Sequence, residues 1–319
     1  GVGSTIPLDA ELSLGADCYS DLVREMIEYV GVDVPYEKAQ GLFAHIFGQS
    51  VSKNAVQGMV TEDAQDVVAY YEEKPAPKPE KEGSILVVQA DGKGVPMVRE
   101  TPVPAKVRLG KGDKRTKKKE AIVTAIFTTE PKPRTPEDVV ASIFHKDEQS
   151  ASPQERAAPV QPQHKQVWAT LAGKDTALQR LAGQVAGRDG THIEHRLALT
   201  DGAEALQMRV MENCPDFTLI LDFIHANEYL WKVGNCLYSE ADPHRSEWVE
   251  ARTLQILSGQ TEQLIAELRT LAQAPDTSKT QQEQLNKTAN YFARNLAYMD
   301  YRSYLAQGWP IASGVIEGA

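Results

Sequence analysis

Two aspartates share one local pattern, at the end of an apolar run and directly before a glycine. Asp91 lies in the segment VVQADG and Asp201 in the segment ALTDGA. Open α/β sheets bind ligands at the carboxyl ends of their strands, and a glycine lets the chain turn there without a side chain over the site. Two such carboxylates favour a hard cation, Mg²⁺ or Mn²⁺, between them. The alternative is that both Asp-Gly pairs only mark turns.

Three other residues could add to this chemistry. Glu317 falls in the first turn of a helix that Ser313 would cap, where an ordinary glutamate is also favoured by the helix dipole. Asp222 and His225 are three residues apart and would be neighbours on a helical turn. A carboxylate can fix the tautomer and orientation of an imidazole. The alternative for this pair is a helix cap beside a buried histidine.

A basic stretch, opposed only by Asp113, indicates a site for phosphate groups. Its members are Lys106, Arg108, Lys111, Lys114, Arg115, Lys117, Lys118 and Lys119. The chain as a whole carries a net charge of −10. Residues 1–73 hold 3 basic and 13 acidic residues, which is 3 − 13 = −10, so the remainder is near neutral. Binding of nucleic acid therefore depends on local features and not on bulk charge.

The N-terminal part reads as helices. Apolar residues between 22 and 30 follow helical spacing, with Gly31 as the expected end. Residues 35–47 and 51–60 predict two more helices, separated by Gly48, with Ser50 or Ser52 as a cap. Helix, glycine-containing turn and helix is the pattern of a helix-turn-helix DNA reader. A plain helical packing module explains the pattern equally well, and the acidic surroundings oppose DNA contact.

After a proline-rich spacer the pattern changes to strands and then to helices. We expect strands at 85–88, 95–98 (after a turn at Gly92–Gly94), 121–128, 195–200 and 217–221. We expect helices at 139–144, 167–185 (broken at Gly173), 203–211 and through most of 226–307. Residues 131–165 otherwise predict a mobile connection. The result is an α/β fold whose mixed sheet is interrupted by an all-α insertion.

The predicted organisation has five parts. They are an N-terminal helical domain (1–73), a Pro-rich linker (74–83), the first part of the α/β domain (84–225), the all-helical insertion (226–308) and the start of the helix that carries Glu317 (309–319).

Together these residues resemble bacterial insertion-sequence transposases of the DDE type, similar to the ISKra group and more distantly to Mutator-like transposases. In that lineage the first Asp ends the first strand, the second lies in an Asp-Gly-Ala segment, a C/DxxH motif follows, and a helical insertion precedes the final Glu. The matching residues are Asp91, Asp201, the pair Asp222 and His225, and Glu317 in the phrase GWPIASGVIE. The resemblance covers roughly residues 85–319.

The resemblance implies a ribonuclease-H-like core and metal-dependent cleavage and transfer of DNA strands. Asp91, Asp201 and Glu317 would be both the catalytic residues and the ligands of two Mg²⁺ or Mn²⁺ ions. The ions would activate water or a 3′-hydroxyl and stabilise the leaving oxygen. The basic stretch would hold the DNA backbone, and five aromatic residues of the insertion could stack on bases. Those residues are Tyr291, Phe292, Tyr298, Tyr301 and Tyr304.

The resemblance also implies partners: double-stranded DNA, as element ends and target, and a second copy of the chain. No apolar run approaches the ~20 residues of a membrane span, and three cysteines without a CxxC pair favour a reducing compartment. We therefore expect a cytoplasmic protein of the bacterial nucleoid. The chain starts at glycine and stops two residues after Glu317, so we expect a fragment whose activity could be impaired.

Two other functions fit the same residues. One is a truncated transposase derivative that binds element ends and represses transposition. The other is a ribonuclease-H-like nuclease that cuts DNA but does not join it. The presence of all three acids favours catalysis, and the long helical block favours a transposase.

Overall fold

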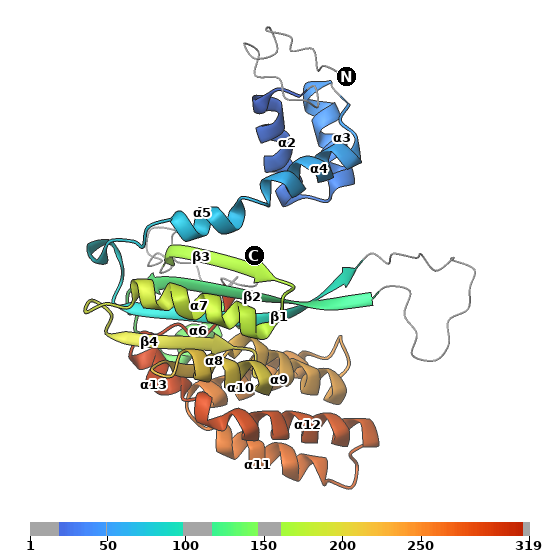
Figure 1. Cartoon of the computed structure of the whole chain (residues 1–319). Helices are drawn as coiled ribbons and strands as arrows, with labels where there is room; N and C mark the ends of the chain where they lie inside the picture. The colour runs from blue at the N-terminus through green and yellow to red at the C-terminus, as the bar shows by residue number, and fades with distance from the viewer. Residues whose placement is uncertain (1–18, 49, 98–116, 146–160, 315–319) are drawn as a thin grey trace, which may run out of the picture. The chain divides into compact units, whose positions relative to one another are not determined.

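The computed structural model describes residues 19–48, 50–97, 117–145 and 161–314 (Figure 1). The chain forms two compact units, Gly1–Pro75 and Ala76–Ala319. Each unit has its own core of buried apolar side chains.

The N-terminal unit is helical, as its apolar spacing predicts. Its helices are α2 (Asp21–Asp33), α3 (Tyr36–Phe47), α4 (Lys53–Asp63) and α5 (Val67–Glu73). Ser20 and Ser52 cap α2 and α4 by accepting backbone N–H bonds. Gly48, at φ +65°, ends α3 as expected.

Gly31 does not end a helix, contrary to the sequence interpretation, because α2 continues to Asp33. A Cβ atom at Gly31 would lie only 3.0 Å from a methyl of Val60 and 3.1 Å from one of Val56. The glycine therefore allows α2 to pack closely against α4. It indicates a helix–helix contact and not the end of a helix.

An acidic cluster in this unit predicts that its stability depends on pH. Burial, together with a hydrogen bond to Asp63, raises the pKa of Glu28 to about 7. The neighbouring charges of Asp63 and Glu62 raise it further, and Arg24, which pairs with Glu62, opposes them. The folded unit therefore holds a proton that the unfolded chain releases near pH 4.5, so the contribution of Glu28 to stability is fully present below that pH and is lost as pH rises through about 7.

We expect Glu28→Gln to remove this dependence. Hydrogen exchange of the α2–α4 amides in the full chain, corrected for intrinsic rates, should show their opening free energy declining from pH 5 to 8 in the wild type. The decline should be much smaller in the variant. Glu25→Gln removes a charge from the same helix and should keep the wild-type dependence. Equal pH profiles for the wild type and Glu28→Gln would contradict the prediction.

The C-terminal unit is built on a five-stranded mixed sheet, which confirms the α/β class. Its strands are β1 (Ile85–Met97), β2 (Lys117–Thr129), β3 (Gln163–Thr170), β4 (His195–Thr200) and β5 (Thr218–Leu221). Their order across the sheet is β3-β2-β1-β4-β5. The β1–β2 and β2–β3 pairs are antiparallel, and the β1–β4 and β4–β5 pairs are parallel, so β2 alone runs against the others.

The first strand corrects one expectation. No turn occurs at Gly92–Gly94: β1 runs unbroken to Met97 and pairs with β2 without a change of register, from Ile85↔Thr129 to Met97↔Lys117. The glycines are compatible with an extended strand because β2 pairs with β1 along this whole length, with Gly92 opposite Ile122 and Gly94 opposite Glu120. Asp91 therefore lies inside a strand and not at its end.

A second correction concerns residues 167–185. The spacing of Val167 and Leu171 imitates a helix face, but Gln163–Thr170 is the edge strand β3, which pairs with β2. The break at Gly173 (φ +102°) is real, and helix α7 (Lys174–Arg188) starts directly after it. An edge strand carries half-exposed residues on both faces, so its sequence lacks the clean alternation of a buried strand.

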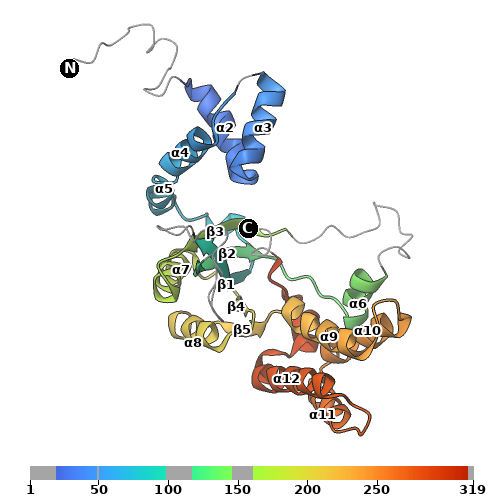
Figure 2. The same cartoon turned by 90° about the vertical axis from the view of Figure 1, so that its right-hand side faces the viewer.

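Helices cover both faces of the sheet (Figure 2). Helices α7 and α8 (Glu204–Asn213) pack on one face, around Leu86, Val88 and Ile126. The other face packs against α6 and the helices after β5, around Val87, Leu197 and Leu199. These helices are α6 (Pro136–Phe144), α9 (Phe223–Leu237), α10 (Pro243–Leu257), α11 (Thr261–Ala272), α12 (Lys279–Asn295) and α13 (Tyr301–Ala306), with short 3₁₀ turns at Pro79–Lys81 and Leu296–Tyr298.

The helical block after β5 confirms the pattern of residues 226–307, but not the proposed stacking on bases. Tyr291, Phe292, Tyr301 and Tyr304 are all buried and belong to the core. Tyr298 is half-buried and packs against the same core. The spacing of these aromatic residues therefore reflects the packing of helices in the core. Among the described residues, no helix combines the length and apolar character that crossing a bilayer would require.

Candidate metal centre

Parallel pairing of β1 and β4 brings the two Asp-Gly aspartates together. The last paired residues are Ala90 and Thr200, so Asp91 and Asp201 follow at the same level of the sheet. The strands differ beyond this point: β4 ends, and Asp201 enters the loop before α8, whereas β1 continues along β2. The predicted convergence therefore arises from strand register, although only Asp201 stands at a strand end.

Backbone groups orient both carboxylates. The N–H of Gly92 donates to Asp91 Oδ1 at 2.7 Å, and the N–H of Ala203 donates to Asp201 Oδ1 at 2.9 Å. No residue in the described parts of the chain donates a hydrogen bond to the Oδ2 atom of either side chain. One oxygen of each half-buried carboxylate is thus held in place while the other is available to a ligand.

The third member of this group is His225, from the first turn of α9. Ligand atoms of Asp91, Asp201 and His225 all lie within 4.8 Å of one another, and all three residues are half-buried. Carboxylate oxygens suit Mg²⁺ and Mn²⁺, and an imidazole nitrogen also suits transition ions. The two carboxylates and the imidazole therefore fit the ligand preferences of one divalent cation.

Asp222 takes the second of the two roles that the sequence allowed for it, that of a helix cap. Its side chain is fully buried, and Oδ1 accepts backbone N–H bonds from Ile224 (2.6 Å) and His225 (3.3 Å). Its Oδ2 accepts the N–H of Ser313 at 2.7 Å. Asp222 therefore contacts the backbone of His225 and not its ring. Asp222 is therefore a helix cap, as one interpretation of the sequence held. The same interpretation made His225 a buried core residue, but its side chain is half-buried and lies beside Asp91 and Asp201.

Ser313 marks the start of the segment that carries Glu317. The residue after it, Gly314, is helical, as the predicted Ser313 cap requires, and Glu317 lies outside the described residues. The bond from Ser313 to Asp222 therefore fixes the beginning of this segment beside the first turn of α9. Asp222 joins two pieces of chain, one bearing His225 and the other leading to Glu317.

Further side chains that the sequence did not single out for this role support the Asp201 loop. Tyr291 donates its hydroxyl hydrogen to the carbonyl of Asp201 at 2.7 Å, and Arg294 donates to the carbonyl of Gly202 at 2.8 Å. The Tyr291 ring stacks on Tyr229, with 3.8 Å between ring centroids. Burial raises the pKa of Tyr291, with the negative charges nearby adding to the effect, so its hydroxyl stays a donor.

Gly202 permits this contact. Its φ is +85°, and a Cβ atom there would lie 2.9 Å from the Tyr291 hydroxyl and 2.8 Å from a methyl of Leu221. A glycine after Asp201 is thus required for backbone shape and for the approach of α12. The Asp-Gly pattern had indicated this, but nothing in the sequence identified Tyr291 as the partner.

The basic stretch is described only at its end. Lys106, Arg108, Lys111, Lys114 and Arg115 lie outside the described residues, as does the side chain of Lys117. Lys118 and Lys119 are exposed on β2. Their contribution to DNA binding remains a prediction.

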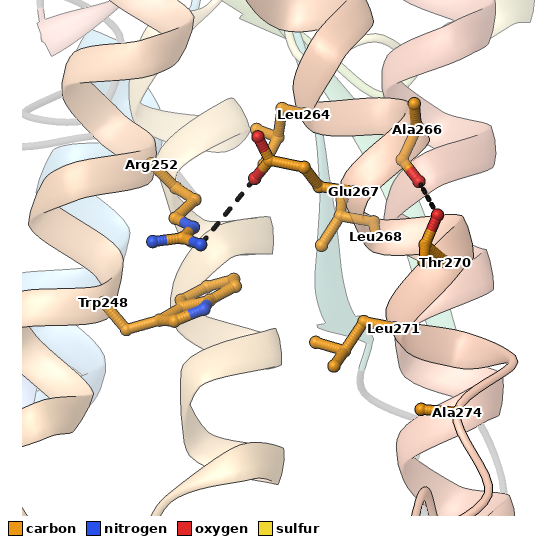
Figure 3. Close-up of a pocket in the computed structure, with 9 residues that line it drawn as sticks. All are labelled: Trp248, Arg252, Leu264, Ala266, Glu267, Leu268, Thr270, Leu271 and Ala274. Carbon is orange, nitrogen blue, oxygen red and sulfur yellow. Dashed lines mark hydrogen bonds and ion pairs between the residues drawn. The ribbon is translucent and has the colours of Figure 1, made fainter.

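A groove of about 650 Å³ lies elsewhere, between α10 and α11 (Figure 3). Trp248 and Arg252 face Leu264, Leu268 and Leu271 across it, and Arg252 pairs with Glu267 at 3.7 Å. None of the residues predicted to do chemistry lines it.

Comparison with known proteins adds no assignment, since no family model and no curated protein matches the chain. The site therefore has to be interpreted from its own geometry.

The double role of Asp222 gives a testable expectation. In Asp222→Asn the retained oxygen can still cap α9, but the new NH₂ group faces the N–H of Ser313, and two donors cannot bond. We expect the free energy of unfolding to fall by ~1–3 kcal/mol in chemical denaturation, the cost of a buried unpaired donor. Asp242→Asn is the matched control, because Asp242 caps α10, its other contact is to the exposed ring of His244 within the same helix, and Asn caps helices equally well. Equal losses in the two variants would contradict the role of the tether.

Proposed function

We propose that the chain is a DDE-type transposase, which cleaves DNA strands and joins them to target DNA with the help of divalent ions. The observation that carries the proposal is the convergence of Asp91 and Asp201, 110 residues apart, on one corner of the sheet together with His225. Like charges gathered at one place destabilise each other unless a cation is bound. An arrangement of this kind is therefore favoured by function and not by stability.

The fold supports the same proposal. A mixed sheet in which only β2 runs antiparallel, with helices on both faces, is the arrangement expected of a ribonuclease-H-like core. The helical block between β5 and the segment leading to Glu317 has the place of the insertion that the resemblance implies. In this proposal it supplies surface for DNA ends and for a second copy of the chain.

The residues would divide the work as follows. Asp91 and Asp201 would hold the divalent ions, His225 would add a nitrogen ligand, and Glu317 would add the third carboxylate. When bound, Mg²⁺ or Mn²⁺ supplies an activated oxygen nucleophile and stabilises charge on the leaving oxygen. The chain positions these ligands: Gly92 and Ala203 orient the carboxylates by their N–H groups, and Asp222 aligns the segments of His225 and Glu317. Those cations of the basic stretch that project on the carboxylate side of the sheet hold the DNA backbone.

A joining assay tests the proposal. Labelled duplexes from the DNA that flanks the gene are incubated with the protein, a supercoiled plasmid and Mg²⁺ or Mn²⁺. A transposase makes label covalent with the plasmid, and chelation by EDTA prevents this. Nicking without joining would favour the nuclease alternative, and specific binding without either reaction would favour the repressor. Absence of binding, nicking and joining would refute the proposal.

A further inference from the structure

A two-stranded ribbon extends the sheet beyond the carboxylates (Figure 1). The β4 partner of β1 ends at Thr200, level with Ala90, whereas β1 and β2 stay paired to Met97. On the other side, the pairing of β2 with β3 reaches only to Ile122. Past Asp91, β1 therefore has only β2 beside it in the sheet.

One face of the ribbon is the face that α7 covers. Glu120 forms an ion pair with Lys174, the first residue of α7. A Cβ atom at Gly92 would lie 2.8 Å from Glu120 Oε1, and one at Gly94 would lie 3.4 Å from Lys118 Cδ. Lys118 and Glu120 therefore project from this side of the ribbon.

The opposite face continues the face of Asp91. Strand side chains alternate, so Lys93, two residues after Asp91, projects on the carboxylate side. Lys119 lies between Lys118 and Glu120 in β2 and projects on the same side. The register pairs Lys93 with Ala121 and Val95 with Lys119. Lys93 and Lys119 are therefore diagonal neighbours on the two strands, a position at which backbones are typically about 7 Å apart.

These two cations are available to a ligand. Lys93 and Lys119 are exposed, and neither forms an ion pair with any residue in the described parts of the chain. The nearby carboxylates repel a phosphate until cations compensate them, so positive charge next to the site has a role in holding a nucleic-acid strand there.

We propose that Lys93 and Lys119 contact successive parts of the phosphate backbone of the DNA strand that enters the carboxylate site. Lys118, on the opposite face, does not contact that strand. The inference rests on the proposed function for the identity of the ligand, but it rests on strand register for the choice of residues. The proposal separates Lys119, on the carboxylate face, from Lys118, on the opposite face. It also adds Lys93, which is not part of the basic stretch.

Salt titration of DNA binding tests the proposal with a matched control. Affinity of a fluorescent 30-base-pair duplex is measured in EDTA between 50 and 300 mM KCl for Lys93→Ala, Lys119→Ala and Lys118→Ala. Each phosphate contact contributes about 0.9 to the slope of log affinity against log salt. We expect each of the first two variants to lose about 0.9 from the slope and about eightfold in affinity at 0.1 M salt. Lys118→Ala, which removes the same charge one residue away, should match the wild type.

The outcomes separate this inference from the proposed function. Equal effects of all three variants, or none from Lys93→Ala and Lys119→Ala, would overturn the inference even if the wild type cleaves and joins DNA. Loss of slope confined to Lys93 and Lys119 in a protein that neither cuts nor joins DNA would support the inference and contradict the proposed function. Lys93→Arg and Lys119→Arg should restore the slope, because charge and not side-chain shape sets it.

Discussion

Asp91→Asn and Asp201→Asn should each lower the rate of Mg²⁺-dependent DNA cleavage about 1000-fold or more, while DNA affinity stays the same or rises. Each variant replaces a carboxylate of the ligand group by a neutral amide, so a ligand and its negative charge are lost. A metal-stabilised transition state depends on such ligands for several kcal/mol, and ~4 kcal/mol corresponds to a factor of about 1000. Affinity should not fall, because removing a negative charge reduces repulsion of phosphate.

Single-turnover cleavage of a labelled duplex, with affinity measured separately in EDTA, checks both halves of this expectation. Asp276→Asn is the control, since Asp276 is exposed in the connection between α11 and α12 and lies outside the metal centre. Isothermal titration with Mn²⁺ provides a readout that does not depend on turnover: binding should weaken at least tenfold in both site variants and not in the control. Cleavage at more than a tenth of the wild-type rate in Asp91→Asn would exclude Asp91 as an essential ligand.

The sequence was sufficient to pair Asp91 with Asp201 as candidates because both follow apolar runs, and their convergence depends on β1 and β4 being parallel neighbours with Ala90 opposite Thr200. It was not sufficient to place His225. Its neighbour in sequence, Asp222, was the natural partner on a helical turn, but that carboxylate is used by backbone N–H groups of α9 and by Ser313. Only the position of α9 over the sheet directs the ring toward the carboxylates.

The same limit applies to the glycines and aromatic residues. Gly31 and Gly92 looked like chain breaks, yet Gly31 lies inside helix α2 and Gly92 inside strand β1. At Gly31 the close approach of α4 leaves little room for a side chain, and at Gly92 the side chain of Glu120 occupies the space of a Cβ atom. Tyr291 and Tyr301 had the composition of a base-stacking surface, but they are buried and donate to backbone carbonyls of Asp201 and Leu221. Local patterns indicate local geometry, whereas these roles depend on contacts with other elements, 25 to 90 residues away in sequence.

The most damaging change for stability is expected far from the metal centre, at a buried ion pair beside the first residues of β1. Arg188, at the end of α7, donates through Nε to Glu82 Oε1 at 2.9 Å and also through Nη2. Both side chains are almost completely buried, with 2% and 1% of their surface exposed. Arg188 also donates to the carbonyl of His164 at 3.1 Å, so it links three segments of the unit.

Arg188→Met should lower the free energy of unfolding of the C-terminal unit by about 3–5 kcal/mol, because it removes the guanidinium that pairs with the buried Glu82 carboxylate and leaves that carboxylate only the Thr128 hydroxyl at 3.4 Å and His192 at 3.5 Å. Arg196→Met is the matched control: Arg196 pairs with Asp189 nearby, but at the surface, and such pairs contribute ~0–1 kcal/mol. Chemical denaturation followed by circular dichroism measures both losses. The double variant Glu82→Gln/Arg188→Met should recover part of the loss, since no buried charge is then left unpaired.

This site also separates folding from chemistry. Glu82 and Arg188 hold the amino end of β1, whereas Asp91 lies nine residues further along the chain from Glu82. At temperatures where Arg188→Met is still folded, its rate of metal-dependent cleavage per folded molecule should therefore equal that of the wild type. A loss of stability no larger than that of Arg196→Met would mean that the buried pair is not an essential contact. A lower rate in fully folded protein would mean instead that the two ends of β1 are mechanically coupled, and that the metal centre depends on the whole length of the strand.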